Sequence, residues 1–174
     1  MAIIFPYNGV TPKIDDNAFV AANAVVTGDV EIGADSGIWY GCVMRGDVNS
    51  IRIGQGTNIQ DGTVVHVSRP FGTVIGDRIT IGHMALIHAC TLEDDCFIGM
   101  KATVMDGAVV GKGALVAAGA LVTPGKQISA GQMWAGAPAK YIRDVNDKDR
   151  EMMNYTQPNY EKLAKDYKQI ESEN

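Results

Sequence analysis

An aliphatic side chain recurs every six residues through most of this 174-residue chain, and no other feature constrains the fold as strongly. Four runs share this spacing, and they begin at Ile14, Ile53, Ile75 and Leu92. The 19 positions in these runs are Ile14, Val20, Val26, Ile32, Ile38, Met44, Ile53, Ile59, Val65, Ile75, Ile81, Ile87, Leu92, Ile98, Val104, Val110, Val116, Val122 and Ile128. A period of six matches neither the repeat of about 3.6 residues in a helix nor the alternation of an ordinary strand.

The six-residue period is typical of a parallel β-helix, in which three short straight segments make up each coil of about 18 residues. Each segment points its aliphatic residue inward, and the many Val and Ile residues favour strands over helices. A β-sandwich of short alternating strands is the alternative, but sandwich strands do not repeat at a constant six residues. We therefore predict an all-β fold built as a parallel β-helix.

The composition changes near the C-terminus, where charged residues become frequent from Asp144 onward. Apolar residues there recur on one face of a helix, at Tyr160, Leu163, Tyr167 and Ile170. We therefore predict a β-helix domain over residues 1–140 and a helical segment over residues 141–174 that packs along the outside of the coils. Pro158 is expected to break or kink this helical stretch.

The only three histidines of the chain fall on the repeat in a way that predicts a metal site. His66 and His88 each follow an inward aliphatic residue, and their separation of 22 equals one coil plus a four-residue insertion. They should therefore stack on one face, on strands about 4.8 Å apart, which lets two imidazoles reach one metal ion. Arg45 should stack one coil before His66, because a three-residue insertion accounts for their spacing.

His83 follows an inward residue on the preceding segment, so it should point away from the His66–His88 pair. Gln60 and Asp61 lie one coil before His83. One chain would therefore carry half of a site on each of two faces. A cyclic trimer, closed through a heterologous interface, would bring the two halves together three times.

Three segments make the chain resemble the γ-class carbonic anhydrases, a family of hexapeptide-repeat proteins whose coils wind left-handed. These segments are "RGD" at 45–47, "NIQDGTVVH" at 58–66 and "GHMALIH" at 82–88. "WAGAPAK" at 134–140 is similar to the usual exit from such a β-helix. The resemblance implies a homotrimer that holds Zn²⁺ or Fe²⁺ through His66 and His88 of one subunit and His83 of the next, with no further cofactor.

The resemblance also implies reversible hydration of CO₂ to bicarbonate by metal-bound hydroxide. Gln60 would hydrogen-bond the nucleophile, Arg45 and Asp61 would pair across the interface, and Asp47 would orient this network. Tyr155 resembles a tyrosine near the site in some members.

Two acidic positions of the family are missing here. Val48 replaces a glutamate, and "VSRPFGT" at 67–73 replaces an acidic loop that contains the proton-shuttling glutamate. We therefore expect any hydration to be slow.

Other functions stay open from the sequence. Many hexapeptide-repeat proteins are CoA-dependent acyltransferases, which need one histidine as a base and no metal. A thioesterase acting on CoA thioesters, or a metal-stabilised structural or assembly protein with little activity, also fits the residues. Arg45 and Asp61 equally fit a plain salt bridge at an interface.

The charge balance and the apolar segments limit the partners and the location. The net charge is −5 and no long basic run occurs, so nucleic acid is not an expected partner. No segment approaches about 18 consecutive apolar residues, so no membrane span is expected. The three cysteines do not form a disulfide framework, and the first residues lack the basic region of a signal peptide. We therefore expect a cytoplasmic protein.

Overall fold

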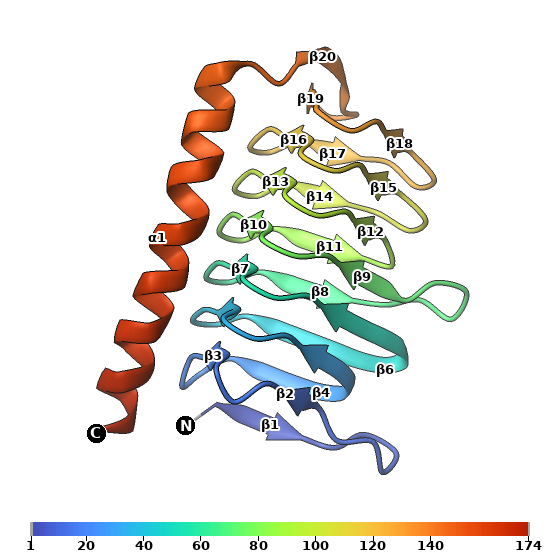
Figure 1. Cartoon of the computed structure of the whole chain (residues 1–174). Helices are drawn as coiled ribbons and strands as arrows, with labels where there is room; N and C mark the ends of the chain where they lie inside the picture. The colour runs from blue at the N-terminus through green and yellow to red at the C-terminus, as the bar shows by residue number, and fades with distance from the viewer. Residues whose placement is uncertain (1, 174) are drawn as a thin grey trace.

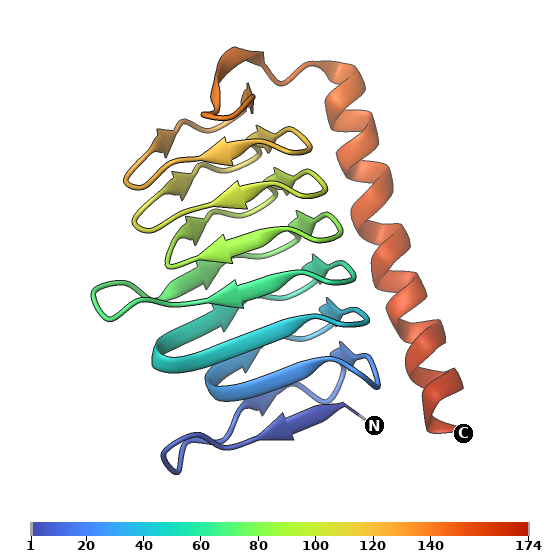
Figure 2. The ribbon, with the colours of Figure 1, turned by 180° about the vertical axis from the view of Figure 1, so that it is seen from behind.

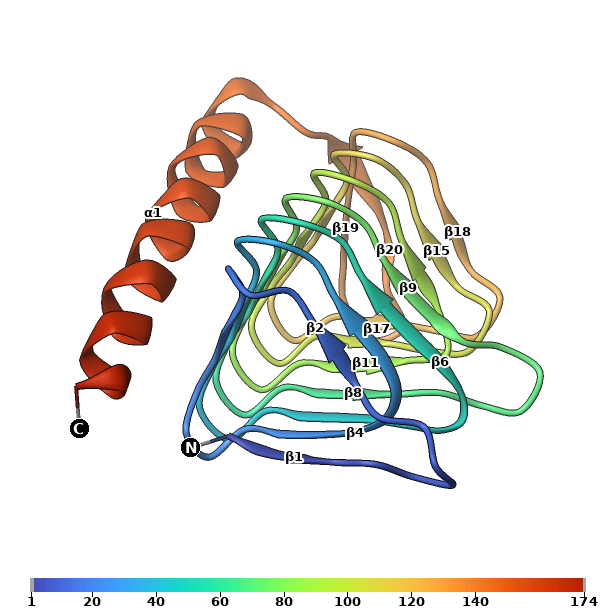
Figure 3. The ribbon, with the colours of Figure 1, turned by 60° about the horizontal axis from the view of Figure 1, so that its bottom comes forward.

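In the computed structural model, which describes residues 2–173, the chain winds into a column of triangular coils with one long helix beside it (Figures 1 and 3). The helix α1 (Asp147–Ser172) runs back along the column, so the C-terminal end returns to the level of the first coils. A 12-stranded and an 8-stranded sheet join the coils. All pairings between the named strands are parallel except that of β19 with β20. The predicted all-β, left-handed parallel β-helix with a C-terminal helix is confirmed.

The triangular section has three faces. The helix-covered face consists of β3 (Phe19–Val20), β5 (Gly37–Ile38), β7 (Asn58–Ile59), β10 (Thr80–Ile81), β13 (Phe97–Ile98), β16 (Leu115–Val116), β19 (Gln132–Ala135) and β20 (Lys140–Asp144). The histidine face consists of β1 (Ile3–Phe5), the first halves of β4 (Val25–Ile32) and β6 (Val43–Ile53), β8 (Val64–His66), β11 (Leu86–His88), β14 (Thr103–Val104) and β17 (Leu121–Val122). The third face consists of β2 (Lys13–Ile14), the second halves of β4 and β6, β9 (Thr73–Ile75), β12 (Thr91–Leu92), β15 (Val109–Val110) and β18 (Gln127–Ile128).

The core of the column consists of the predicted inward residues, which stand in one ladder on each face. On the histidine face the ladder runs in register through Val26, Met44, Val65, Ile87, Val104 and Val122. Of the 19 predicted positions, 17 are buried, and only Ile14 and Val20 in the first coil are half-buried. Burial of each such side chain contributes about 1.5–3 kcal/mol, which explains why the repeat dictates the coil.

The insertions in the repeat are absorbed at the corner between the histidine face and the third face. The three extra residues after Met44 lengthen β6, which continues around this corner as one strand. The longer insertion forms a loop at residues 67–72, which stands out beyond the other corners (Figure 2). Because both insertions lie at this corner, the ladders remain in register on either side of them.

The helix α1 packs on the helix-covered face, as predicted. The indole ring of Trp39 contacts the rings of Tyr160 and Tyr167 edge-on, with centroids 5.4 and 5.3 Å apart. Of the break or kink expected at Pro158, the break does not occur: α1 is continuous from residue 147 to 172. Packing against the coils offsets the lost backbone hydrogen bond; Gln157 Nε2, for example, donates to the Gly56 carbonyl at 2.7 Å. Within residues 2–173, no helix has the length and apolar character needed to cross a membrane.

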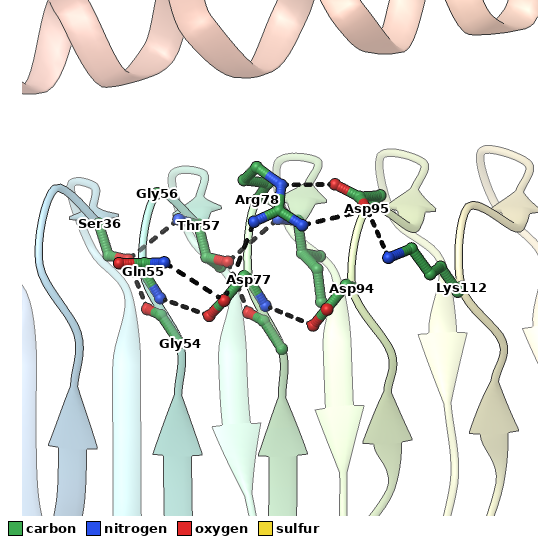
Figure 4. A network of polar contacts seen from close by, with 12 residues as sticks. Ser36, Gly54, Gln55, Gly56, Thr57, Asp77, Arg78, Asp94, Asp95 and Lys112 are labelled. Atoms are coloured by element: carbon green, nitrogen blue, oxygen red, sulfur yellow. Dashed lines mark hydrogen bonds and ion pairs between the residues drawn. The ribbon is translucent and has the colours of Figure 1, made fainter.

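The corner that lies under α1, between the third face and the helix-covered face, is joined by polar contacts (Figure 4). Asp94 Oδ1 accepts the backbone N–H of Asp77 at 3.0 Å, and Asp77 accepts that of Gln55 at 2.9 Å. Arg78 donates two hydrogen bonds to Asp95, which lower the pKa of that carboxyl. These side chains join neighbouring coils in the middle of the column, at a corner without histidines.

Candidate metal centre

Two histidines converge at the corner between the histidine face and the third face. Arg45, His66 and His88 stand in register on β6, β8 and β11, as the repeat predicts. His66 Nδ1 lies 3.1 Å from His88 Nε2. Two imidazole nitrogens bound to one tetrahedral zinc ion lie about 3.3 Å apart, because each Zn–N bond is about 2.0–2.1 Å. The two rings therefore already present their nitrogens at nearly the spacing that a shared metal ion requires.

The outer nitrogen of each of these rings contacts a carboxylate. His66 Nε2 lies 3.1 Å from Asp47 Oδ1, and His88 Nδ1 lies 2.7 Å from Asp106 Oδ1. Burial opposes ionisation of both acids, but hydrogen bonds outweigh it and lower their pKa values, from Arg45 and His66 for Asp47 and from His88 for Asp106. Histidines that bind metals almost always donate their second N–H to such a group. The donor set therefore fits a metal ion held by the two inner nitrogens.

The third histidine lies at a different corner, between the helix-covered face and the histidine face. His83 follows β10, and its Nδ1 lies 3.0 Å from Asp61 Oδ2, one coil earlier. Its Nε2 lies 3.4 Å from the hydroxyl of Tyr160 on α1. Within residues 2–173 of one chain, no group of three potential ligands is arranged to hold a metal ion. The histidine face therefore has a pair of histidines along one edge and His83 along the other.

The remaining predicted residues lie around these two edges. Gln60 is buried beside Asp61, and its Nε2 donates to Asn58 Oδ1 at 3.1 Å. Arg45 forms an ion pair with Asp47 of its own chain and leaves about half of its side chain exposed (49%). One chain does not contain the predicted pair of Arg45 and Asp61.

Two residues near the histidines were missed from the sequence, Asp106 and Tyr160. Tyr155 is 74% exposed, whereas Tyr160 is the tyrosine of α1 that reaches His83. The repeat contained a signal for Asp106, which lies one coil of 18 residues after His88. It contained none for Tyr160, because the repeat does not determine where a helix crosses the coils.

Within residues 2–173, the histidine face has a largely apolar exterior that α1 does not cover. Its outward ladder is Val25, Val43, Val64, Leu86, Thr103 and Leu121. The corresponding ladder on the third face includes Lys13, Glu31 and Arg52, and α1 covers the helix-covered face. Val64 is 37% exposed, and Met84 beside His83 is 56% exposed. An apolar surface with histidines along both edges is suited to contact with another copy of the chain.

Comparison with known proteins identifies relatives over nearly the whole chain. The repeat family described as bacterial transferase hexapeptide (six repeats) matches residues 11–46 and 89–124. The mitochondrial gamma carbonic anhydrase 2 of Arabidopsis thaliana is 49% identical over 94% of this chain and 64% of its own length. A carbonic anhydrase of Geobacillus kaustophilus is 40% identical, with 98% of this chain and 94% of the relative covered.

Among solved structures, a protein of Bacillus cereus described as a putative acetyltransferase superposes with a TM-score of 0.96 at 38% identity, covering 97% of this chain and 98% of that one. A hexapeptide transferase family protein of Anaplasma phagocytophilum has a TM-score of 0.91 at 47% identity, covering 95% of this chain and 98% of that one. The chain spans 58–64% of the length of the three Arabidopsis relatives.

Proposed function

Because this chain belongs to the γ-class carbonic anhydrase family of hexapeptide-repeat proteins, we propose that it catalyses the reversible hydration of CO₂ to bicarbonate at a metal ion shared between subunits. One observation carries the proposal more than any other. Each of the three histidines has one ring nitrogen beside an aspartate, and the other nitrogens of His66 and His88 face each other. This pair and His83 lie along opposite edges of one apolar face.

The metal ion would be held by His66 and His88 of one subunit and by His83 of the next. Imidazole nitrogens suit both Zn²⁺ and Fe²⁺, so the donor set does not choose between them. An ion held by three neutral histidines would keep its full charge and would lower the pKa of a bound water to about 7. Asp47 and Asp61 would hold the outer N–H groups of the His66 and His83 rings, which would direct the remaining nitrogens of these two rings toward the ion.

The trimer is proposed from the exterior of the histidine face. A heterologous contact through this face places the His66–His88 edge of one subunit against the His83 edge of its neighbour. Three such contacts close a ring, and each contact completes one site. The uncovered ladder that includes Val64 and Leu86 supplies the apolar surface for this contact.

The other side chains act on the substrate and its proton. Gln60, buried beside the His83 edge, would hydrogen-bond the attacking oxygen. Arg45 would pair with Asp61 of the neighbouring subunit and place positive charge beside the bicarbonate. Val48 and the 67–72 loop contribute no carboxylate to accept the released proton. Proton export is therefore expected to limit the rate and to depend on buffer.

The second candidate is acyl transfer from CoA, because the similar structure from Bacillus cereus is described as a putative acetyltransferase. Such a reaction needs one histidine as a general base and no metal. Here the two histidines that could serve face each other across 3.1 Å, and each contacts an aspartate, which favours a metal site over a lone base.

Stopped-flow CO₂ hydration and metal analysis on the same purified preparation test the proposal. We expect about one metal ion per chain and hydration that is lost when a chelator removes the metal. Metal-loaded protein without hydration would indicate a structural or assembly role. A metal-free preparation that acetylates a small amine or alcohol would support the acyltransferase, and one that hydrolyses a CoA thioester would support the thioesterase.

A further inference from the structure

Asp106 has a position that the proposed reaction does not use directly. It lies in the turn after β14, one coil beyond His88, and its Oδ1 is 2.7 Å from His88 Nδ1. This is the shortest of the three contacts between an aspartate and a histidine in the chain as described by residues 2–173. Within residues 2–173, the carboxylate forms no hydrogen bond or ion pair with His66, so its polar contact with the pair is to His88.

The contact determines which nitrogen of His88 is available. A hydrogen bond from Nδ1–H to the carboxylate leaves Nε2 without a proton, and Nε2 is the atom that faces His66 at 3.1 Å. The same bond restricts rotation of the ring about its bond to Cβ. It also adds negative charge behind the imidazole, which makes Nε2 a better donor to a cation.

The turn that carries Asp106 is itself held in place. Gly107, the next residue, adopts a φ of +66°, and a Cβ added there would lie 3.7 Å from the ring of Phe71 in the 67–72 loop. The carboxylate side chain is 32% exposed, so it is partly covered at this corner. Phe71 of the loop therefore lies close to the turn that carries Asp106.

We propose that Asp106 is a positioning residue for the metal centre, which orients His88 and directs its Nε2 toward the ion. The inference rests on the proposed function, because it assumes that His88 is a ligand. It assigns to Asp106 an effect on metal affinity and no contact with the substrate.

The test is the zinc dissociation constant of the assembled protein, measured by competition with a chromophoric chelator. Asp106→Ala should raise this constant about 10–100-fold, the range typical for loss of such a partner of a metal-bound histidine. Asp106→Asn retains an oxygen that accepts the Nδ1–H and should have a smaller effect. Asp94→Ala is the matched control, since Asp94 occupies a corner turn without histidines (Figure 4).

The outcomes separate the inference from the function. The inference is supported if the zinc dissociation constant rises for Asp106→Ala and not for Asp94→Ala. In that case Asp106→Ala should lower the melting temperature of the metal-free protein no more than Asp94→Ala does. An unchanged zinc dissociation constant for Asp106→Ala, or an equal rise for Asp106→Ala and Asp94→Ala, overturns the inference and leaves the proposed function intact. If the unaltered protein binds neither zinc nor iron, both the inference and the proposed function fail.

Discussion

Subunit complementation should restore a predictable fraction of metal sites from two inactive variants. His83→Ala removes one edge of the site, and His66→Ala removes the other, so trimers of either variant alone should hold no metal tightly. In a mixed trimer, one of the three contacts joins a subunit with an intact His66–His88 pair to a neighbour with an intact His83. Equal co-expression with random assembly places both variants in about three quarters of the trimers, so about one quarter of all sites should be complete.

The assay measures the zinc content per chain after co-expression. The rate of CO₂ hydration by the same sample should recover to the same fraction of the rate of the unaltered protein. The matched control is the mixture of His66→Ala with His88→Ala. Both changes lie on the same edge, so no contact in any mixed trimer is complete and no recovery is expected. Equal recovery in both mixtures, or none in the first when mass measurement shows mixed trimers, would refute the division of the site between subunits.

Three further predictions concern the proton path, the core and the helix. The rate of CO₂ hydration should be low in dilute buffer and rise with added imidazole. Phe71→Glu should reduce this dependence on buffer if the new carboxylate faces the metal. Fast hydration at all buffer concentrations would contradict the prediction. Ile87→Ala should cost about 2–5 kcal/mol in denaturant unfolding because Ile87 is fully buried, whereas Val74→Ala, at a side chain 48% exposed, should cost about 0.5 kcal/mol. Hydrogen bonds from Arg143 lower the pKa of Asp149 in the folded state, so the ionised carboxylate stabilises the folded protein above about pH 4. This stabilisation should be lost as the pH falls through the pKa of Asp149 in the folded state. The melting temperature of Asp149→Asn should therefore lie below that of the unaltered protein at neutral pH and equal it in strong acid. A difference in melting temperature that does not change with pH would contradict this assignment.

The sequence predicts the coil well because a single physical requirement recurs at every sixth residue. Val65, Ile87 and Val104 must each be buried, and a coil of three six-residue segments buries all such residues at once. The same register places His66 beside His88, since each follows a residue whose direction is already determined.

The parts that the sequence does not predict depend on contacts between elements. The repeat has no bearing on where α1 crosses the column, so Tyr160 could not be distinguished from Tyr155 as the residue near His83. Local propensity predicts an interruption at Pro158, but packing of α1 on the coils outweighs it. Asp106 could have been found, because the register that relates His66 to His88 also relates His88 to Asp106.

Native mass spectrometry of the zinc-loaded protein tests most directly the claim that each metal ion is held between two subunits. We predict a species with the mass of three chains and three zinc ions. His83→Ala should remove all three ions, because His83 completes every site. A monomer that retains one zinc ion, or a trimer of His83→Ala that retains three, would contradict the shared site.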